Sequence, residues 1–129
     1  MAKIIYISGP YSGETEEEIQ ANIAAAENVA REMAKKGFFF ICPHLNSAGM
    51  HTMDVPIEFW YKMDLEILSR CDAIYMMKNW NKSRGARNEL VYAYSKGIEI
   101  FFEGYDDYAG CLLHSAPWRL LKYSSDIAG

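Results

Sequence analysis

The sequence predicts an α/β fold with a parallel sheet of four to five strands and helices on both faces. Apolar segments rich in β-branched and aromatic residues alternate four times with helix-length amphipathic segments. The strand segments are apolar throughout, which is typical of strands that are buried on both faces of a parallel sheet. A length of 129 residues suits one such unit, so we expect a single domain over residues 1–129 with a doubly wound, flavodoxin-like or Rossmann-like sheet.

The first strand is expected over residues 3–8, and it ends at a loop with glycine at both ends, Gly9-Pro10-Tyr11-Ser12-Gly13. A helix should follow, because Thr15 and Glu18 have the spacing of a capping box and Gly37 is placed to close the far end. Its apolar stripe keeps the helical period at Ile19, Ile23, Ala26, Ala30 and Met33.

The later elements follow the same alternation. We expect a strand over 38–42, a loop over 44–55, a helix from Pro56 to about Arg70, a strand over 72–77, a helix from about Arg84 to about Lys96, and a strand over 98–102. A terminal helix is expected within residues 112–121.

Composition limits the classes of partner. The net charge of -4 argues against a nucleic-acid polymer, which needs a basic surface. Three cysteines at unrelated spacings fit reduced thiols in a cytoplasmic protein better than disulfides or a zinc site, so we expect no metal. Half of the residues are apolar, yet no run is long enough for a signal peptide or a membrane span, and we expect a soluble protein without a membrane partner.

The segment Ser83-Arg84-Gly85-Ala86-Arg87-Asn88-Glu89 is the most informative part of the chain. A loop with a hydroxyl and a glycine leads from the third strand into a helix, whose free N–H groups favour an anion such as phosphate. Parallel sheets bind ligands beyond the carboxyl ends of their strands, so this loop and the 9–13 loop should meet. Ser12 offers one hydroxyl there, and Gly9 and Gly13 allow close approach of the backbone, although a plain tight turn explains the glycines equally well.

Two acids lie beside apolar helix stripes, where a solvated carboxylate is not expected. Glu89 stands next to the stripe that includes Ala86 and Ala93, and Asp64 falls on the stripe that includes Trp60 and Leu68. An ordinary surface acid is the common alternative for either residue. Their position near converging loops instead favours a site in which at least one carboxylate acts as a nucleophile or proton carrier.

Aromatic side chains suggest contacts for a flat ring. Trp80, in the loop before Ser83, is the better stacking candidate, whereas core packing is expected for Trp60. His44 follows the second strand and is a candidate contact, with a solvent-facing histidine as the alternative. His51 carries no readable signal.

With these residues identified, the chain resembles the nucleoside 2-deoxyribosyltransferase superfamily, closest to the nucleoside 5'-monophosphate N-glycosidases and their phage-borne relatives. The resemblance covers residues 3–102. Tyr6-Ile7-Ser8-Gly9 is similar to the family's first strand and loop, Asp64 precedes Asp72 by eight residues, and Ser83 precedes Glu89 by six, as in the family.

The resemblance implies roles for these positions. Glu89 would attack the anomeric carbon of the sugar, Tyr6 would orient Glu89, and Asp64 would bond a sugar hydroxyl. Phosphate would be held by Ser83, Gly85 and the backbone of 9–13, including Tyr11 and Ser12. The family's transferases of free nucleosides usually place an acid at the position of Ser83, and a hydroxyl attracts phosphate where an acid repels it.

The implied activity is hydrolysis of the N-glycosidic bond of a 2'-deoxynucleoside 5'-monophosphate through a glycosyl-glutamate intermediate, in a homo-oligomer and without cofactor. The resemblance does not identify the base of the substrate. Transfer of the sugar between bases and non-catalytic nucleotide binding are the alternatives. The chain departs from the family's monophosphate hydrolases at Pro10 and Ser12, where they carry serine and arginine, and Arg84 or Arg87 would have to compensate.

Overall fold

The computed structural model describes residues 3–104, and the terminal helix predicted within residues 112–121 lies outside this range. The strands are β1 (Ile4–Ser8), β2 (Phe39–Ile41), β3 (Ala73–Met76) and β4 (Glu99–Phe102). The helices are α1 (Glu16–Lys35), α2 (Pro43–Asn46), α3 (Ile57–Leu68) and α4 (Arg84–Ser95), with 3-10 turns η1 (Met50–Thr52) and η2 (Trp80–Lys82).

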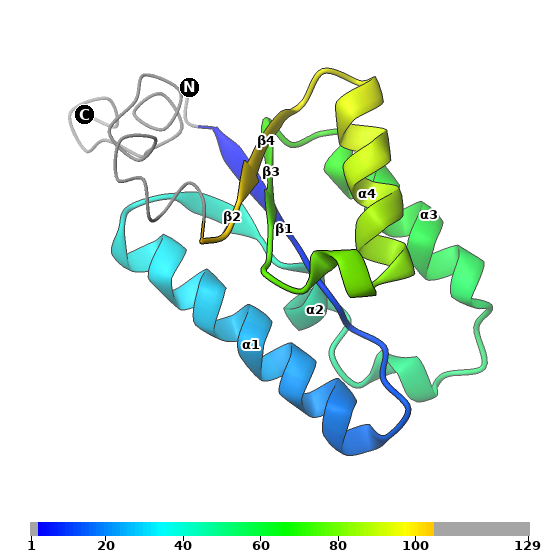
Figure 1. Cartoon of the computed structure of the whole chain (residues 1–129). Coiled ribbons are helices and arrows are strands. Elements are labelled where there is room, and N and C mark those ends of the chain that lie inside the picture. The colour runs from blue at the N-terminus through cyan, green and yellow to red at the C-terminus, as the bar shows by residue number, and fades with distance from the viewer. Residues whose placement is uncertain (1–2, 105–129) are drawn as a thin grey trace.

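The strands form one parallel sheet in the order β2-β1-β3-β4, which confirms the predicted fold class (Figure 1). On the central strand, Tyr6 pairs with Ile41 of β2 and with Ile74 of β3. The chain first winds outward from β1 to β2 and then crosses back to β3 on the other side of β1. The winding therefore reverses between β1 and β3, where open α/β sheets bind ligands.

Helix α1 covers one face of the sheet, and α3 and α4 cover the other (Figure 1). Side chains alternate along β1 accordingly, because successive residues of a strand point to opposite faces. Ile5 and Ile7 belong to the core cluster that includes the stripe of α1, whereas Tyr6 belongs to the cluster formed with α3 and α4. By the same alternation, Ser8 faces α3 and α4 together with Tyr6.

The ends of α1 follow the sequence signals that predicted them. Thr15 accepts a hydrogen bond from the N–H of Glu18 at 3.1 Å, and the carboxylate of Glu18 accepts one from the N–H of Glu14 at 2.6 Å. At the far end Gly37 has a φ of 84°, and the N–H of Phe38 bonds the carbonyl of Met33 at 3.0 Å. This is the Schellman arrangement, and it needs a residue that tolerates positive φ.

The predicted loop over 44–55 is only partly correct. Residues 43–46 form α2, because Pro43 has the fixed φ of a first helical residue and the N–H groups of Leu45 and Asn46 bond the carbonyl of Cys42. A 3-10 turn, η1, follows it.

The helix predicted from Pro56 has Pro56 as its N-cap, so α3 begins one residue later, and it ends at Leu68 rather than near Arg70. The other differences from prediction are shifts of one residue at strand ends, together with the turn η2 inside the loop before α4. None of the helices within residues 3–104 has the length and apolar character needed to cross a membrane.

Candidate active site

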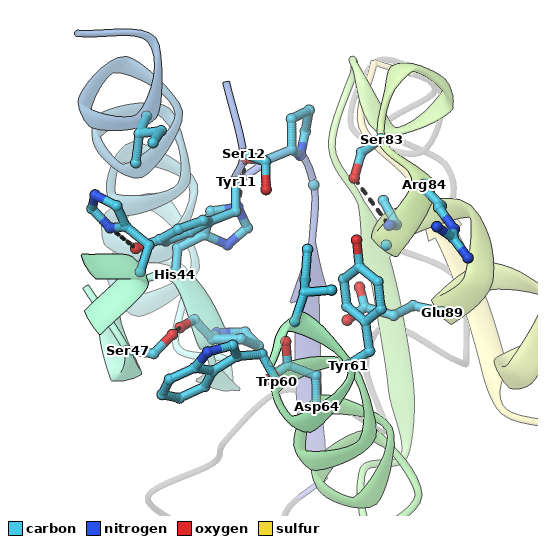
Figure 2. Close-up of a pocket in the computed structure, with 18 of the residues that line it drawn as sticks. Tyr11, Ser12, His44, Ser47, Trp60, Tyr61, Asp64, Ser83, Arg84 and Glu89 are labelled. Atoms are coloured by element: carbon cyan, nitrogen blue, oxygen red, sulfur yellow. Dashed lines mark hydrogen bonds between the residues drawn. The ribbon is translucent and has the colours of Figure 1, made fainter. Parts of the chain in front are cut away.

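A pocket of about 460 Å³ lies where the segments that follow β1 and β3 meet, at the point where the winding of the sheet reverses. Both predicted loops line it, 9–13 from β1 and 82–86 before and within α4. Residues of α2, η1 and α3 complete the wall. Figure 2 shows Asp64 and Glu89 reaching the pocket from different helices, with Ser83 at the same side as Glu89 and His44 across from it.

Glu89, on α4, is half-buried and has both carboxylate oxygens engaged. The hydroxyl of Tyr6 donates to Oε2 at 2.5 Å, and the hydroxyl of Ser8 donates to Oε1 at 2.5 Å. Tyr6 and Ser8 are both fully buried, so neither hydroxyl has water as a competing partner. The carboxylate is therefore held in one orientation at the wall of the pocket.

Burial raises the pKa of Glu89 to about 7, although the hydrogen bonds from Ser8 and Tyr6 act in the opposite direction. The nearby charge of Asp64 adds to the rise. The pKa of the Tyr6 hydroxyl lies well above its usual value, because it is buried and faces Glu89 and Asp64. Tyr6 is therefore a neutral donor, and Glu89 titrates near neutral pH.

Asp64 is the second acid of the pocket. It is half-buried on α3, and its Oδ1 is buried without a hydrogen-bond partner among the described residues. Burial raises its pKa to about 6. An unpaired buried carboxylate oxygen is costly, and a hydroxyl donor of a ligand would satisfy it.

The start of α4 offers donors to an anion. Ser83 is the N-cap, and its Oγ accepts the N–H of Ala86 at 3.1 Å, which leaves the hydroxyl hydrogen free to donate elsewhere. The N–H groups of Arg84 and Gly85 are the first two of the helix and have no carbonyl partner within it. Lys82, which the sequence analysis did not single out, and Arg84 also line the pocket.

Arg87 does not contribute to this pocket. Its Nη1 donates to the carbonyl of Asn81 at 2.8 Å and so fixes the turn before α4, which leaves Arg84 as the arginine beside the ligand space.

The glycines of the first loop are required by packing inside the protein. A Cβ at Gly9 would lie 2.6 Å from Sδ and 3.0 Å from Cβ of Met77, and one at Gly13 would lie 2.6 Å from Cβ of Glu18. The loop is held further by Asn22, whose amide donates to the carbonyls of Tyr11 and Ser12 at 3.1 Å. Steric contact with Met77 and Glu18 therefore accounts for both glycines. Residues 9–13 form no turn and neither glycine has a positive φ, so the tight-turn alternative is wrong, although both residues line the pocket.

His44 is buried, and its Nε2 lies 2.7 Å from the carbonyl of Pro10. Because a carbonyl can only accept, Nε2 carries the hydrogen and Nδ1 is left bare. Burial lowers the pKa of His44, so the ring is neutral. His44 lines the pocket, so its contact with a ligand stays a prediction, and its hydrogen bond to Pro10 fixes the first loop.

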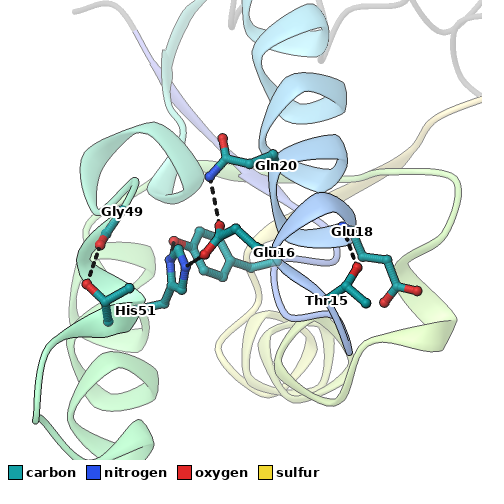
Figure 3. Close-up of polar contacts among 8 residues, drawn as sticks. Thr15, Glu16, Glu18, Gln20, Gly49 and His51 are labelled. Atoms are coloured by element: carbon teal, nitrogen blue, oxygen red, sulfur yellow. Dashed lines mark hydrogen bonds and ion pairs between the residues drawn. The ribbon is translucent and has the colours of Figure 1, made fainter.

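A chain of three polar side chains connects that loop to η1. The hydroxyl of Tyr11 bonds Nδ1 of His51 at 2.9 Å. Nε2 of His51 in turn bonds Glu16 at 2.9 Å (Figure 3). Because the carboxylate of Glu16 accepts, Nε2 of His51 carries a hydrogen, and in the neutral ring Nδ1 accepts from the hydroxyl of Tyr11. His51 gave no signal in the sequence, because its two partners are 40 and 35 residues away.

The environments of Trp60 and Trp80 are the reverse of those predicted. Trp80 is outside the set of residues that line the pocket, and its ring packs 5.8 Å from that of Phe102 in the core, which contradicts the predicted stacking on a ligand. Trp60, expected in the core, lines the pocket instead. The reason is the turn η2, which directs Trp80 back onto the sheet. Tyr61, beside Trp60, also lines the pocket and was missed.

Within residues 3–104, no group of three or more histidine, cysteine, aspartate or glutamate side chains is arranged to hold a metal ion. The absence of a metal stays a prediction for the chain as a whole.

Two solved structures resemble this fold. A 2-deoxyribosyltransferase from the psychrotolerant bacterium Bacillus psychrosaccharolyticus aligns with a TM-score of 0.54 and 23% identity over 77% of this chain and 70% of its own. A 2-deoxyribosyltransferase from Leishmania mexicana aligns with a TM-score of 0.55 and 21% identity over 78% of this chain and 63% of its own, which is less than two thirds of its length. At such identities the likeness establishes the fold.

No curated protein matches the sequence. The family model described as "Domain of unknown function (DUF4406)" matches residues 3–102, a range that contains all of the pocket. The chain therefore belongs to the DUF4406 family.

Proposed function

We propose that this protein hydrolyses the N-glycosidic bond of a 2'-deoxynucleoside 5'-monophosphate, releasing the free base and 2-deoxyribose 5-phosphate. The observation that carries the proposal is the carboxylate of Glu89, which two buried hydroxyls hold at a pocket wall with a second acid nearby. Such an arrangement suits a nucleophile that must be aimed at one carbon atom.

The reaction would proceed in two displacements, as in retaining glycosidases. Glu89 attacks the anomeric carbon C1', a C–O bond forms, and the C1'–N bond breaks with its electron pair passing to the base, which takes a proton from solvent. Water then attacks C1' and loses one proton to solvent, the bond to Glu89 breaks, and the carboxylate is regenerated. Asp64, with an unsatisfied oxygen in the same pocket, would accept a hydrogen bond from a sugar hydroxyl.

The start of α4 supports a phosphorylated substrate. A phosphate there would receive the hydroxyl of Ser83 and the N–H groups of Arg84 and Gly85, with the positive charges of Lys82 and Arg84 at the same side of the pocket. Arg84 would replace the arginine that the first loop lacks.

The opposite wall supports a flat aromatic ligand. Tyr11 lies 5.8 Å from His44 between ring centroids, and Trp60 lines the same pocket. Aromatic walls of this kind pack against the face of a base. We therefore assign Tyr11, His44 and Trp60, rather than Trp80, to the base.

The experiment is to incubate the full chain with each deoxynucleoside monophosphate and to measure free base by chromatography. We expect release from at least one substrate, and a loss of about a thousandfold or more in Glu89→Gln, because the variant lacks the proposed nucleophile and Asp64, the other acid of the pocket, is assigned to the sugar hydroxyl. Glu66→Gln makes the same change at an exposed acid on α3 and should retain the parent's rate. No release from any substrate by the parent would refute the proposal.

Transfer of the sugar to a second base is the other candidate, favoured by the names of the two similar structures, both 2-deoxyribosyltransferases. The two activities share the first displacement and differ in what resolves the intermediate. Adding an excess of a different base separates them, because a new nucleotide carrying that base means transfer and an unchanged yield of sugar phosphate means hydrolysis.

A further inference from the structure

Ser8 is the last residue of β1, and its side chain is fully buried. The pocket is lined by its neighbours Ile7 and Gly9 but not by Ser8 itself. Nevertheless its hydroxyl lies 2.5 Å from Oε1 of Glu89. The hydroxyl therefore contacts the proposed nucleophile from behind, on the side away from the ligand space.

Tyr6 holds the other oxygen, Oε2, and unlike Ser8 it lines the pocket. Residues 6 and 8 point to the same face of the strand because side chains alternate with a period of two. The strand thus presents one donor to each oxygen of the carboxylate. Because Tyr6 lines the pocket and Ser8 does not, we infer that Oε2, which bonds Tyr6, is nearer the ligand space and that Oε1, which bonds Ser8, is turned inward.

We propose that Ser8 is a positioning residue, which holds Oε1 of Glu89 inward so that Oε2 is the atom that attacks the sugar. This inference rests on the proposed function. In the first displacement Oε2 forms the bond to C1', the C1'–N bond breaks, and Oε1 becomes the carbonyl oxygen of the ester, still bonded to Ser8. When water attacks C1', the electron pair returns to Oε2, and the carboxylate keeps its orientation for the next cycle.

The bond also favours the ionised carboxylate, since an ionised oxygen accepts more strongly than a protonated one. The other titratable groups that face Glu89 are Tyr6 from β1 and Asp64 from α3. Neither changes when Ser8 is replaced, so a change in the titration of Glu89 reports the lost hydrogen bond. If Ser8 had only a structural role at the buried end of β1, its replacement would change the stability of the protein but not the titration of Glu89.

The test uses Ser8→Ala, which removes the donor, and Ser8→Cys, which fills the space with a weak donor and serves if the alanine variant fails to fold. Ser8→Thr retains the hydroxyl and should rescue both properties below. Ser69→Ala is the matched control, because it removes a serine hydroxyl bonded at 2.6 Å to a helix carbonyl far from the pocket.

Two readouts are measured. The first is the titration of the Glu89 carboxyl carbon by NMR of glutamate-labelled protein, identified by its absence in Glu89→Gln. We expect its midpoint to move to higher pH in the alanine and cysteine variants. The second is base release, for which we expect kcat to fall roughly tenfold to a hundredfold, as for loss of a hydrogen bond to a charged group, with KM within about twofold.

The outcomes separate this inference from the proposed function. A shifted titration in a parent that releases no base would uphold the positioning of the carboxylate and refute the activity. An active parent whose Ser8→Ala and Ser8→Cys variants match Ser69→Ala in titration and kcat would overturn the role of Ser8 and leave the activity standing.

Discussion

At the scale of single residues, the carboxyl group of Glu89 is placed where its ionised form is disfavoured, and the proposed reaction requires that form. Burial raises its pKa to about 7, while hydrogen bonds from Ser8 and Tyr6 limit the rise. Strongly perturbed pKa values of this kind cluster at functional sites.

The rate should therefore depend on pH in a defined direction. Because the nucleophile must be ionised, kcat/KM of the parent is expected to rise with pH through a midpoint near the pKa of Glu89, about 7. In Asp64→Asn the midpoint should move to lower pH, since the like charge that raises the pKa of Glu89 is gone. Measuring kcat/KM against pH for both proteins with one substrate checks this. The same midpoint in the parent and in Asp64→Asn would contradict it.

The same raised pKa affects stability. The folded protein holds the Glu89 proton up to about pH 7, whereas the unfolded chain releases it near the ordinary value of 4.5, so stability falls as pH rises through this window. Glu89→Gln does not titrate. We expect its melting temperature, relative to the parent, to increase as pH is raised from 4.5 to 7. A difference between the two melting curves that stays constant over this range would contradict the buried titration.

At the scale of elements, α1 and α4 begin with the same device, and only one of them faces the pocket. Ser83 caps α4 and Thr15 caps α1, each by accepting an N–H three residues later at 3.1 Å. Either cap replaced by alanine should cost about 1 kcal/mol of stability. Comparing the two alanine variants therefore separates the effect of losing a helix cap from the effect of losing a ligand contact.

We expect Ser83→Ala to raise KM for the monophosphate by roughly tenfold, because a hydroxyl donor to phosphate is lost. Thr15→Ala should lose similar stability and keep the parent's KM. Thermal melts and initial rates on the two variants provide the measurement. If KM of Ser83→Ala equals that of Thr15→Ala and the parent, Ser83 does not bind the phosphate.

The elements also show what the sequence determines. Strands and long helices were predictable because their signals are local: apolar runs, the Thr15 and Glu18 spacing, and Gly37 at a helix end. The short helix α2 was not, because four residues carry too little periodicity to separate a helix from a turn, and only Pro43 gave a start signal.

Part of the site was also predictable from local sequence signals. Glu89 and Asp64 were found because acids beside apolar stripes conflict with the helical pattern. The role of Ser8 was not predictable, since a serine at a strand end is also an ordinary residue. The places of Trp60 and Trp80 depend on how α3 and η2 turn against the sheet, which is set by tertiary packing.

At the scale of the whole molecule, the site is assembled from segments separated by more than eighty residues, such as Tyr6 and Glu89. Strand β1 pairs with β3, and α4 packs against β3 and β4, which brings Tyr6 and Glu89 together. The pocket should therefore form only in the folded chain. The predicted homo-oligomer is checked by light scattering, where a mass near 14.7 kDa would mean a monomer.

The chemistry is expected to need no metal. The proposed steps use a carboxylate, hydroxyl donors and water, so extensive dialysis against EDTA should leave base release unchanged. Loss of activity that Mg²⁺ or Zn²⁺ restores would show a metal requirement and contradict the proposed steps.

The proposed reaction requires that Glu89 becomes covalently attached to the sugar. The most direct measurement is rapid acid quench of the protein with its substrate, followed by mass spectrometry of the intact chain and of its peptides. We expect an added 2-deoxyribose 5-phosphate on the peptide that contains Glu89, and none in Glu89→Gln. An adduct on a different residue, or base release by Glu89→Gln at the parent's rate, would contradict it.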